Sequence, residues 1–434
     1  MATIFQDARL STSIARKIYS SLPSASSTRL LQLEPGSYND RLEASLVVVD
    51  IESPLCSEYE CISYTWGDET SPNSINVDGN EVPLRLNLEQ ALRRFRSATK
   101  SRLLWVDAIS IRQDDADEKA QQVTMIGDVF QNATRVLAWL GEHADSSENL
   151  FDISEEAATS LFDRDRAQFR QKYDTLARFM DRRYWHRTWI VAEIVCAREL
   201  VICCGPDRIA WSHLLKYKFT DVMRFDQGWT RRLTKLDDAR QAHRFAHSNH
   251  PSHISDVEWE GHRELQGYLY ATENTECLEP RDTIFSLRAI LHSTSMRNAI
   301  RVDYTIPVPE LCAATLKAAL VSYDSSQNNI AEFLLLSYQL DKSLAMTLPK
   351  RLQLIDLLLD DPEGFEPPAL AIVSDILSDG AAEKFFGIEY EPYDEEWNWE
   401  QKRDHVLSWR DKARRTGKWS ATSSCNDSTG SRLR

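Results

Sequence analysis

The chain has 434 residues, 42% of them hydrophobic, and a formal net charge of -15. This length favours two or three domains with packed cores, and the acidic balance argues against nucleic acid or an anionic membrane as the main partner, since both favour a basic face. No apolar run approaches the roughly 20 residues of a membrane-spanning helix.

The N-terminal residues and the cysteines bear on the cellular location of the protein. The N-terminus lacks the basic-then-apolar order of a secretory signal, so we expect residues 1–26 to form a surface arm, with a transit peptide as the alternative. The eight cysteines show no C-x-x-C pair and no regular framework. This is typical of reduced thiols in a cytosolic or nuclear protein, and we expect a cytoplasmic location.

Strand patterns begin the folded part of the chain. Residues 29–36, 44–51 and 59–64 are predicted strands, the first ended by a Pro-Gly turn. Asp78-Gly79 between alternating residues predicts a hairpin over residues 74–86. Asn87 is then expected to cap a helix.

The end of the third strand is a candidate binding site. Tyr64, Trp66 and Asp68 gather there around Gly67, and these residue types suit stacking and hydrogen bonding. The alternative is a tryptophan that closes the sheet edge beside an ordinary turn.

We interpret residues 103–133 as the segment around which the chain is organised. Residues 103–109 predict a strand interrupted by one carboxylate, Asp107, and Asp115 with Glu118 predicts a capping box at the start of a helix. The apolar stripe of that helix comprises Val123, Ile126, Phe130 and Ala133. A second strand over residues 134–141 implies a parallel pair. A carboxylate at the end of a parallel strand lies where such sheets place ligands, and Gln113 follows it closely.

The later chain changes character. A polar, acidic excursion over residues 142–163 precedes a helix and a strand at residues 199–205. We therefore expect an α/β domain over residues 27–205, a mainly helical continuation over 206–330, a less defined region over 331–419 and a disordered tail over 420–434.

Glu193 is a second candidate. It lies one helical turn after Trp189 among apolar neighbours, a setting that disfavours its ionised form and suits acid-base or cation-stabilising work. The alternative is a structural ion pair with Arg182, Arg183 or Arg187. No metal site is expected, because Pro251 breaks the helix between the paired histidines of residues 243–253.

Ordered motifs across residues 27–305 resemble the fungal heterokaryon incompatibility (HET) domain. The first two are Tyr59-Glu-Cys-Ile-Ser-Tyr-Thr-Trp-Gly-Asp68 and Leu104-Trp-Val-Asp-Ala-Ile-Ser-Ile-Arg-Gln-Asp-Asp115. Later ones are Tyr184-Trp-His-Arg-Thr-Trp-Ile-Val-Ala-Glu193 and Glu279-Pro-Arg-Asp-Thr-Ile-Phe-Ser-Leu287. The chain departs from the family at Ser110 and Arg112, where Cys and Asn are usual, and at Ala192, where Gln is usual.

The resemblance implies a parallel-sheet, flavodoxin-like domain that is distantly similar to Toll-receptor-type (TIR) domains, some of which cleave NAD. It implies an effector of fungal self/non-self recognition that leads to cell death, with Glu193 as the catalytic residue of an NAD glycohydrolase. NAD would then be a substrate and no cofactor would be required. The expected substrate-binding residues are Tyr64, Trp66, Gly67, Asp68, Asp107, Gln113 and Trp189. The alternative is a non-catalytic module that acts by self-association or by binding a protein partner.

Overall fold

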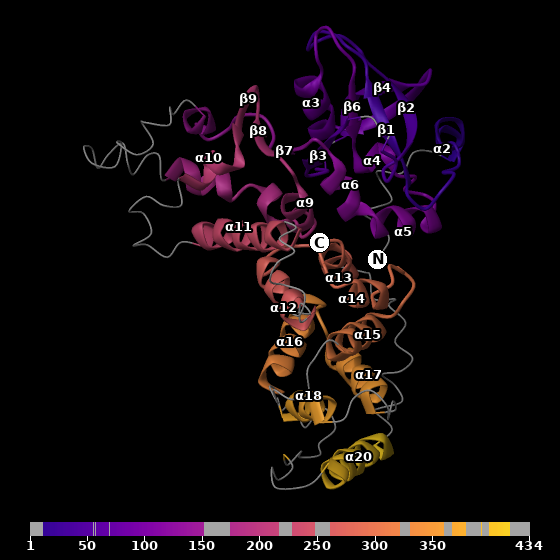
Figure 1. The fold of residues 1–434 in the computed structure, drawn as a ribbon, viewed down its shortest axis with the longest axis vertical. Coiled ribbons are helices and arrows are strands. Elements are labelled where there is room, and N and C mark those ends of the chain that lie inside the picture. The colour runs from indigo at the N-terminus through magenta and orange to yellow at the C-terminus, as the bar shows by residue number, and fades with distance from the viewer. Residues whose placement is uncertain are drawn as a thin grey trace, which may run out of the picture. The chain divides into compact units, whose positions relative to one another are not determined.

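The computed structural model describes residues 12–54, 56, 58–68, 70–151, 174–216, 228–247, 261–321, 330–359, 367–378, 392 and 399–416. The chain divides into two compact units (Figure 1). One comprises residues 2–248 with 274–278, and the other comprises residue 1 with 249–273 and 279–434. All described strands belong to the first unit, and the described elements of the second unit are helices. The expected boundaries at residues 205 and 330 remain predictions.

The first unit is built on one nine-stranded sheet, which confirms the α/β class. The strand order is β5-β4-β2-β1-β6-β3-β7-β8-β9. The strands are β1 Ser27–Leu33, β2 Leu42–Asp50, β3 Glu60–Tyr64, β4 Thr70–Val77, β5 Asn80–Arg85, β6 Arg102–Trp105, β7 Arg135–Trp139, β8 Leu200–Cys204 and β9 Asp207–Ala210.

The expectation of a parallel sheet is wrong, because the sheet is mixed. Parallel pairing joins β6-β3-β7-β8 and also β2 with β4, whereas β1 pairs antiparallel with β2 and β6, β4 with β5, and β8 with β9. The hairpin over residues 74–86 is confirmed as β4 and β5. Short connections such as Asp78-Gly79 and Gly205-Pro206 permit only antiparallel neighbours, because a parallel pair needs a crossover of a dozen or more residues.

The four central parallel strands determine where the candidate site lies. Across the sheet they lie in the order β6, β3, β7 and β8, so the second of the four in the chain comes first, followed by the first, the third and the fourth. Tyr64 of β3 is in register with Trp139 of β7, and Trp139 with Cys203 of β8. The loops that leave the carboxyl ends of these strands therefore start from one edge of the sheet.

Helices α2 (Thr12–Ile18) and α3 (Leu86–Phe95) cover one face of the sheet. The α3 side chains Leu88, Ala91, Leu92 and Phe95 are buried against it, as their spacing predicts. Asn87 does not cap this helix, which is a correction. The strand β5 runs directly into α3, so Arg85 takes the N-cap position and Asn87 lies inside the helix.

Helices α4 (Asp107–Ser110), α5 (Ala116–Thr124) and α6 (Ile126–Asn132) follow β6. The expected strand over residues 103–109 ends at Trp105, and Asp107 opens α4. The Asp115 Oδ1 atom accepts from the Glu118 amide at 3.0 Å, which confirms the N-cap. The expected single helix is interrupted at Met125, yet its apolar stripe remains buried.

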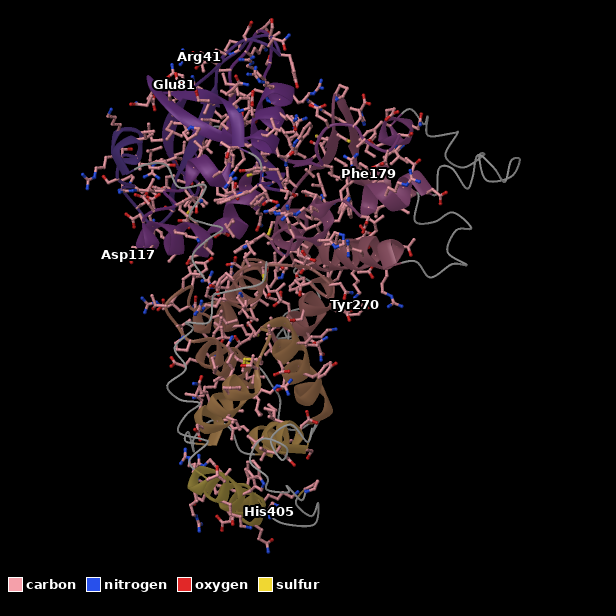
Figure 2. The ribbon with its side chains drawn as sticks, turned by 180° about the vertical axis from the view of Figure 1, so that it is seen from behind. Arg41, Glu81, Asp117, Phe179, Tyr270 and His405 are labelled. Atoms are coloured by element: carbon pink, nitrogen blue, oxygen red, sulfur yellow. The ribbon has the colours of Figure 1, made fainter. Side chains whose placement is uncertain are left out.

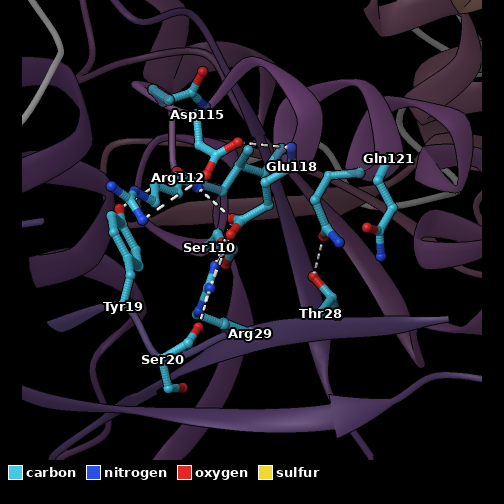
Figure 3. A network of polar contacts seen from close by, with 12 residues as sticks. Tyr19, Ser20, Thr28, Arg29, Ser110, Arg112, Asp115, Glu118 and Gln121 are labelled. Atoms are coloured by element: carbon cyan, nitrogen blue, oxygen red, sulfur yellow. Dashed lines mark hydrogen bonds and ion pairs between the residues drawn. The ribbon is translucent and has the colours of Figure 1, made fainter. Parts of the chain in front are cut away.

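A buried arginine fixes the loop between α4 and α5 (Figure 3). The Arg29 side chain, 1% exposed, donates to Glu118 Oε1 at 2.6 Å and to Oε2 at 3.0 Å. It also donates to the carbonyl oxygens of Ser20 and Ser110, while Glu118 accepts from the amide of Arg112 at 2.9 Å. These contacts tie strand β1 to the loop that carries Gln113.

The sheet unit is completed by η1 Ser147–Leu150, η2 Arg183–His186, α9 Ile190–Cys196, α10 Trp211–Lys216 and α11 Gly228–His247. Figure 2 shows its side chains, including the surface ion pair of Arg41 and Glu81.

The helical unit contains α12 Gly261–Ala271, α13 Arg281–Arg288, α14 Thr294–Ala299, α15 Val308–Val321, α16 Ile330–Ser343, α17 Leu348–Leu359, α18 Pro367–Ser378 and α20 Trp399–Arg415. Ile284, Phe285 and Leu316 are fully buried in this part of the chain. The expected tail over 420–434 lies outside the described residues. Among the helices that the structure describes, none combines the length and apolar character needed to cross a bilayer.

Candidate functional site

One polar group forms around Asp107, directly after β6. Its Oδ2 atom accepts from Trp66 Nε1 at 2.7 Å, and its Oδ1 atom accepts from the amide of Ala108 at 2.7 Å. The hydroxyl of Tyr64, the last residue of β3, lies near this carboxylate and opposes the effect of burial on the pKa of Asp107. Gln113 Nε2 donates to the carbonyl oxygen of Asp107 at 2.9 Å. We call Tyr64, Trp66, Asp107 and Gln113 the Asp107 group.

A second polar group forms around Glu193 in α9. The Glu193 residue is 6% exposed, with apolar neighbours packed on both sides of it in the helix. Its carboxylate accepts from Ser63 Oγ and lies 3.3 and 3.4 Å from the two terminal nitrogens of Arg187. Ser63 Oγ in turn is 2.7 Å from the Tyr184 hydroxyl. We call Ser63, Tyr184, Arg187 and Glu193 the Glu193 group.

The structure selects one of the three ion-pair partners considered for Glu193. Arg187 makes the pair, whereas Arg182 donates to the carbonyl oxygen of Leu140 and Arg183 pairs with Asp68. The ion pair with Arg187 is mostly enclosed, since the two side chains are 20% and 7% exposed. An enclosed pair of this kind is consistent with a structural role as well as a catalytic one.

Arg187 also couples the two groups electrostatically. Burial raises the pKa of Glu193 and of Asp107, and the positive charge of Arg187 opposes that rise in both. Burial by itself would lower the pKa of Arg187, but the charges of Glu193 and Asp107 raise it above its usual value. The guanidinium is therefore held charged by its ion pair with Glu193 and by the nearby charge of Asp107.

The hydroxyls of the site stay protonated at neutral pH. Burial raises the pKa of Tyr64 and of Tyr184, and the neighbouring carboxylates raise it further. These phenols can therefore donate hydrogen bonds without ionising. Two carboxylates against one guanidinium leave the combined site with one excess negative charge when all three are ionised.

The remaining predicted residues have different settings. Asp68 points outward, with a side chain 78% exposed, and pairs with Arg183 at 2.7 Å. Gly67 adopts a φ of 73°, which explains why a glycine turns the chain between Trp66 and Asp68. Trp189 stands at the N-cap of α9 and is partly exposed, and its carbonyl oxygen accepts from the Glu193 amide at 3.2 Å.

Ser63 and Tyr184 were not among the predicted site residues, and Arg187 was considered only as an ion-pair partner. Strand alternation could have predicted that the Ser63 side chain points to the face opposite Tyr64. No local sequence signal indicates that Tyr184 lies against it. A later segment also contributes. The chain at Arg187 forms a parallel bridge with Glu276, and the Thr188 amide donates to the Glu276 carbonyl oxygen at 3.2 Å.

The histidine-rich interval is only partly described. His243 lies in α11, and residues 248–260, which include His250 and His253, lie outside the described residues. Within the described ranges no group of three or more His, Cys, Asp or Glu side chains has an arrangement suited to a metal ion. The seven cysteines in these ranges form no disulfide.

Comparisons with known proteins relate the site to a family. A family model described as "Heterokaryon incompatibility protein (HET)" matches residues 59–193, a range that contains both polar groups. A curated relative from Neurospora crassa, "Heterokaryon incompatibility protein 6, OR allele", is 29% identical over 244 residues, covering 45% of this chain and 35% of the relative. The chain thus spans about a third of the length of that relative. No solved structure matches the chain.

Proposed function

We propose that this protein, which carries a HET domain over residues 59–193, acts in fungal heterokaryon incompatibility and triggers cell death when activated. The observation that carries the proposal is that both polar groups lie inside the matched range. The printed name of the N. crassa relative supports the same role. The trigger is proposed to be a protein partner or self-association, and the place of action the cytoplasm.

Cleavage of NAD at the nicotinamide ribosyl bond is the finer proposal. The order of the central strands, second-first-third-fourth, supports a flavodoxin-like and TIR-like core, because that order is also found in flavodoxin-like sheets. In such sheets ligands bind outside the carboxyl ends of the strands, which is where the Asp107 group lies.

Glu193 is the proposed catalytic residue. When the bond from the ribose to the positively charged nicotinamide ring breaks, the ring takes the electron pair and leaves as neutral nicotinamide. The ribosyl group passes through an oxocarbenium-like state that water captures with loss of a proton, and an ionised carboxylate can stabilise that state without a metal. Ser63 and Arg187 would orient the Glu193 oxygens, and Trp189, at the start of the same helix, would shape the pocket. NAD is the substrate in this proposal, and no cofactor is required.

A non-catalytic signalling module is the alternative function. The observation that favours it is the enclosure of Glu193, which is 6% exposed and ion-paired with Arg187. A buried, paired carboxylate is what a structural role requires. In this case the HET domain would act by oligomerisation or by binding a partner protein.

Nicotinamide release from NAD distinguishes the two functions. We expect purified protein to release nicotinamide from NAD. We expect the rate of release to be at least about 100-fold lower in the Glu193→Gln and Glu193→Asp variants. The aspartate keeps the negative charge of the ion pair, so we expect the variant to fold. Its side chain is one methylene shorter, so the carboxylate no longer reaches the position that Glu193 occupies. Wild-type protein that releases no nicotinamide at any pH would refute the cleavage.

Growth arrest tests the broader role. Expression of the chain in a filamentous fungus is expected to stop growth, and expression of Glu193→Gln at an equal level is expected not to. Growth arrest by a variant that is inactive on NAD would support the signalling module. Unimpeded growth with abundant wild-type protein, with and without a candidate incompatible partner strain, would contradict the incompatibility role.

A further inference from the structure

We propose that Arg187 is the positioning residue of this site: its guanidinium holds the Glu193 carboxylate in a two-point ion pair and supplies the positive charge nearest to both Glu193 and Asp107. The activity readout of this inference rests on the proposed NAD cleavage. A second readout, the pH dependence of stability, does not.

The geometry of the ion pair carries the first half of the proposal. The two terminal nitrogens of Arg187 face the two oxygens of Glu193 at 3.3 and 3.4 Å, the side-by-side arrangement that a planar guanidinium makes with a carboxylate. Two parallel contacts fix the plane of the carboxylate as well as its position. The Ser63 hydroxyl also donates to the Oε2 atom.

The backbone of Arg187 is itself held from outside the local sequence. Segment 274–278 bridges to it at Glu276, and the Thr188 hydroxyl lies 3.0 Å from the Thr275 hydroxyl. Four residues earlier, Arg183 has no such anchor in the described contacts, and its side chain is 71% exposed. The chain therefore orders one arginine of this run and leaves the other at the surface.

The charges around Arg187 carry the second half. The ionisable groups of the described residues that face Arg187 or its partners are Asp107, Glu193, Tyr64, Tyr184 and the thiols of Cys61 and Cys203, and among these groups Arg187 is the cation. The phenols and the thiols have raised pKa values and remain neutral. Arg187 thus supplies the positive charge that opposes the effect of burial on both carboxylates.

Removal of this charge has a predictable sign. Without Arg187 the pKa of Glu193 and of Asp107 rises further, so the ionised carboxylate forms only at higher pH. A carboxyl group whose pKa is raised in the folded state binds protons more tightly there than in the unfolded chain. Its contribution to stability is therefore present at low pH and is lost as the pH rises through the folded-state pKa.

The experiment compares Arg187→Gln, Arg187→Lys and the matched surface variant Arg183→Gln. The rate of nicotinamide release is expected to rise with pH as the Glu193 carboxylate ionises. In Arg187→Gln this rise is expected to occur about one to three pH units higher than in wild type. In Arg187→Lys it is expected to stay near the wild-type pH while kcat falls, because the charge remains but the two-point orientation is lost. An unchanged pH profile and kcat in both Arg187 variants would overturn the proposal.

Thermal melting from pH 4 to pH 8 supplies the independent readout. The loss in Tm of Arg187→Gln relative to wild type is expected to widen as the pH rises, whereas Arg183→Gln is expected to lose little at any pH. If wild-type protein releases no nicotinamide, the proposed cleavage fails and the melting series alone decides the role of Arg187. A Tm loss that does not change with pH would refute it. Should Arg187→Gln not fold, Arg187→Met replaces it in both tests as the uncharged variant, and Arg187→Lys still tests the orientation of Glu193, since a wild-type kcat in that variant would overturn the proposal.

Discussion

Substitution of Glu118 by glutamine tests the buried network that holds the loop next to Asp107 (Figure 3). Glutamine keeps the shape of the side chain and one acceptor oxygen for the Arg112 amide. It removes the charge that faces the Arg29 guanidinium at 2.6 and 3.0 Å. The arginine would then stand in the core with only neutral acceptors.

The size of the effect follows from burial. Arg29 is 1% exposed and Glu118 is 13% exposed, so solvent screens the pair little. Loss of one partner of a buried ion pair costs about 3–5 kcal/mol, because the remaining charge stays desolvated. The carbonyl oxygens of Ser20 and Ser110 still accept from Arg29, so we place Glu118→Gln near the lower value, about 3 kcal/mol.

Urea unfolding followed by tryptophan fluorescence measures the loss, since Trp105, Trp139 and Trp185 are buried in the same unit as the pair. The matched control is Glu81→Gln, which removes the charge of the exposed Arg41–Glu81 pair, with side chains 58% and 53% exposed. An exposed pair contributes about 0–1 kcal/mol. Equal losses in the two variants would refute the reasoning from burial.

The double variant Arg29→Met with Glu118→Leu sharpens the test. It replaces both charges by apolar groups and leaves no uncompensated charge in the core. Such replacements are often neutral in stability. We therefore expect the double variant to be more stable than Glu118→Gln alone, and a double variant that is less stable would show that the pair itself contributes net stability.

Further predictions concern single contacts near the sheet edge. Asn87→Ala is expected to cost about 1–3 kcal/mol in urea unfolding, because the buried Trp139 Nε1 atom loses its acceptor at 2.9 Å. Gly205→Ala is expected to lower Tm by several degrees, about 1–3 kcal/mol, since Gly205 has a φ of 54° and a Cβ atom would lie 2.6 Å from the His143 ring; an unchanged melt would contradict this. Asp115→Ala is expected to cost about 1 kcal/mol through loss of its N-cap contact, and Asp115→Asn should recover most of it.

The local signals in the sequence predicted much of the sheet unit. Alternating residues around Asp78-Gly79 gave the hairpin, and the spacing of Leu88, Ala91, Leu92 and Phe95 gave the buried face of α3. The position of Asp107 at the end of a strand, with Trp66 at the end of another, anticipated that the two side chains would be near each other. Each of these features depends on residues a few positions apart or on the common edge of parallel strands.

The sequence did not predict features that depend on pairing between distant segments. Periodicity predicts that β1 is a strand but not that it lies antiparallel between β2 and β6, because strand direction depends on the connections and on which edges are free. The error in the parallel-sheet expectation has this origin.

The choice of side chains that form the site likewise depends on contacts between distant segments. The sequence by itself determined that Glu193 lies on a helix among apolar neighbours, and that Arg182, Arg183 and Arg187 stand close enough to pair with it. Only the tertiary structure selected Arg187, because segment 274–278, about 90 residues later in the chain, fixes its backbone. Local sequence sets which charges are available, whereas the choice among them depends on long-range contacts that bury one arginine and leave another in water.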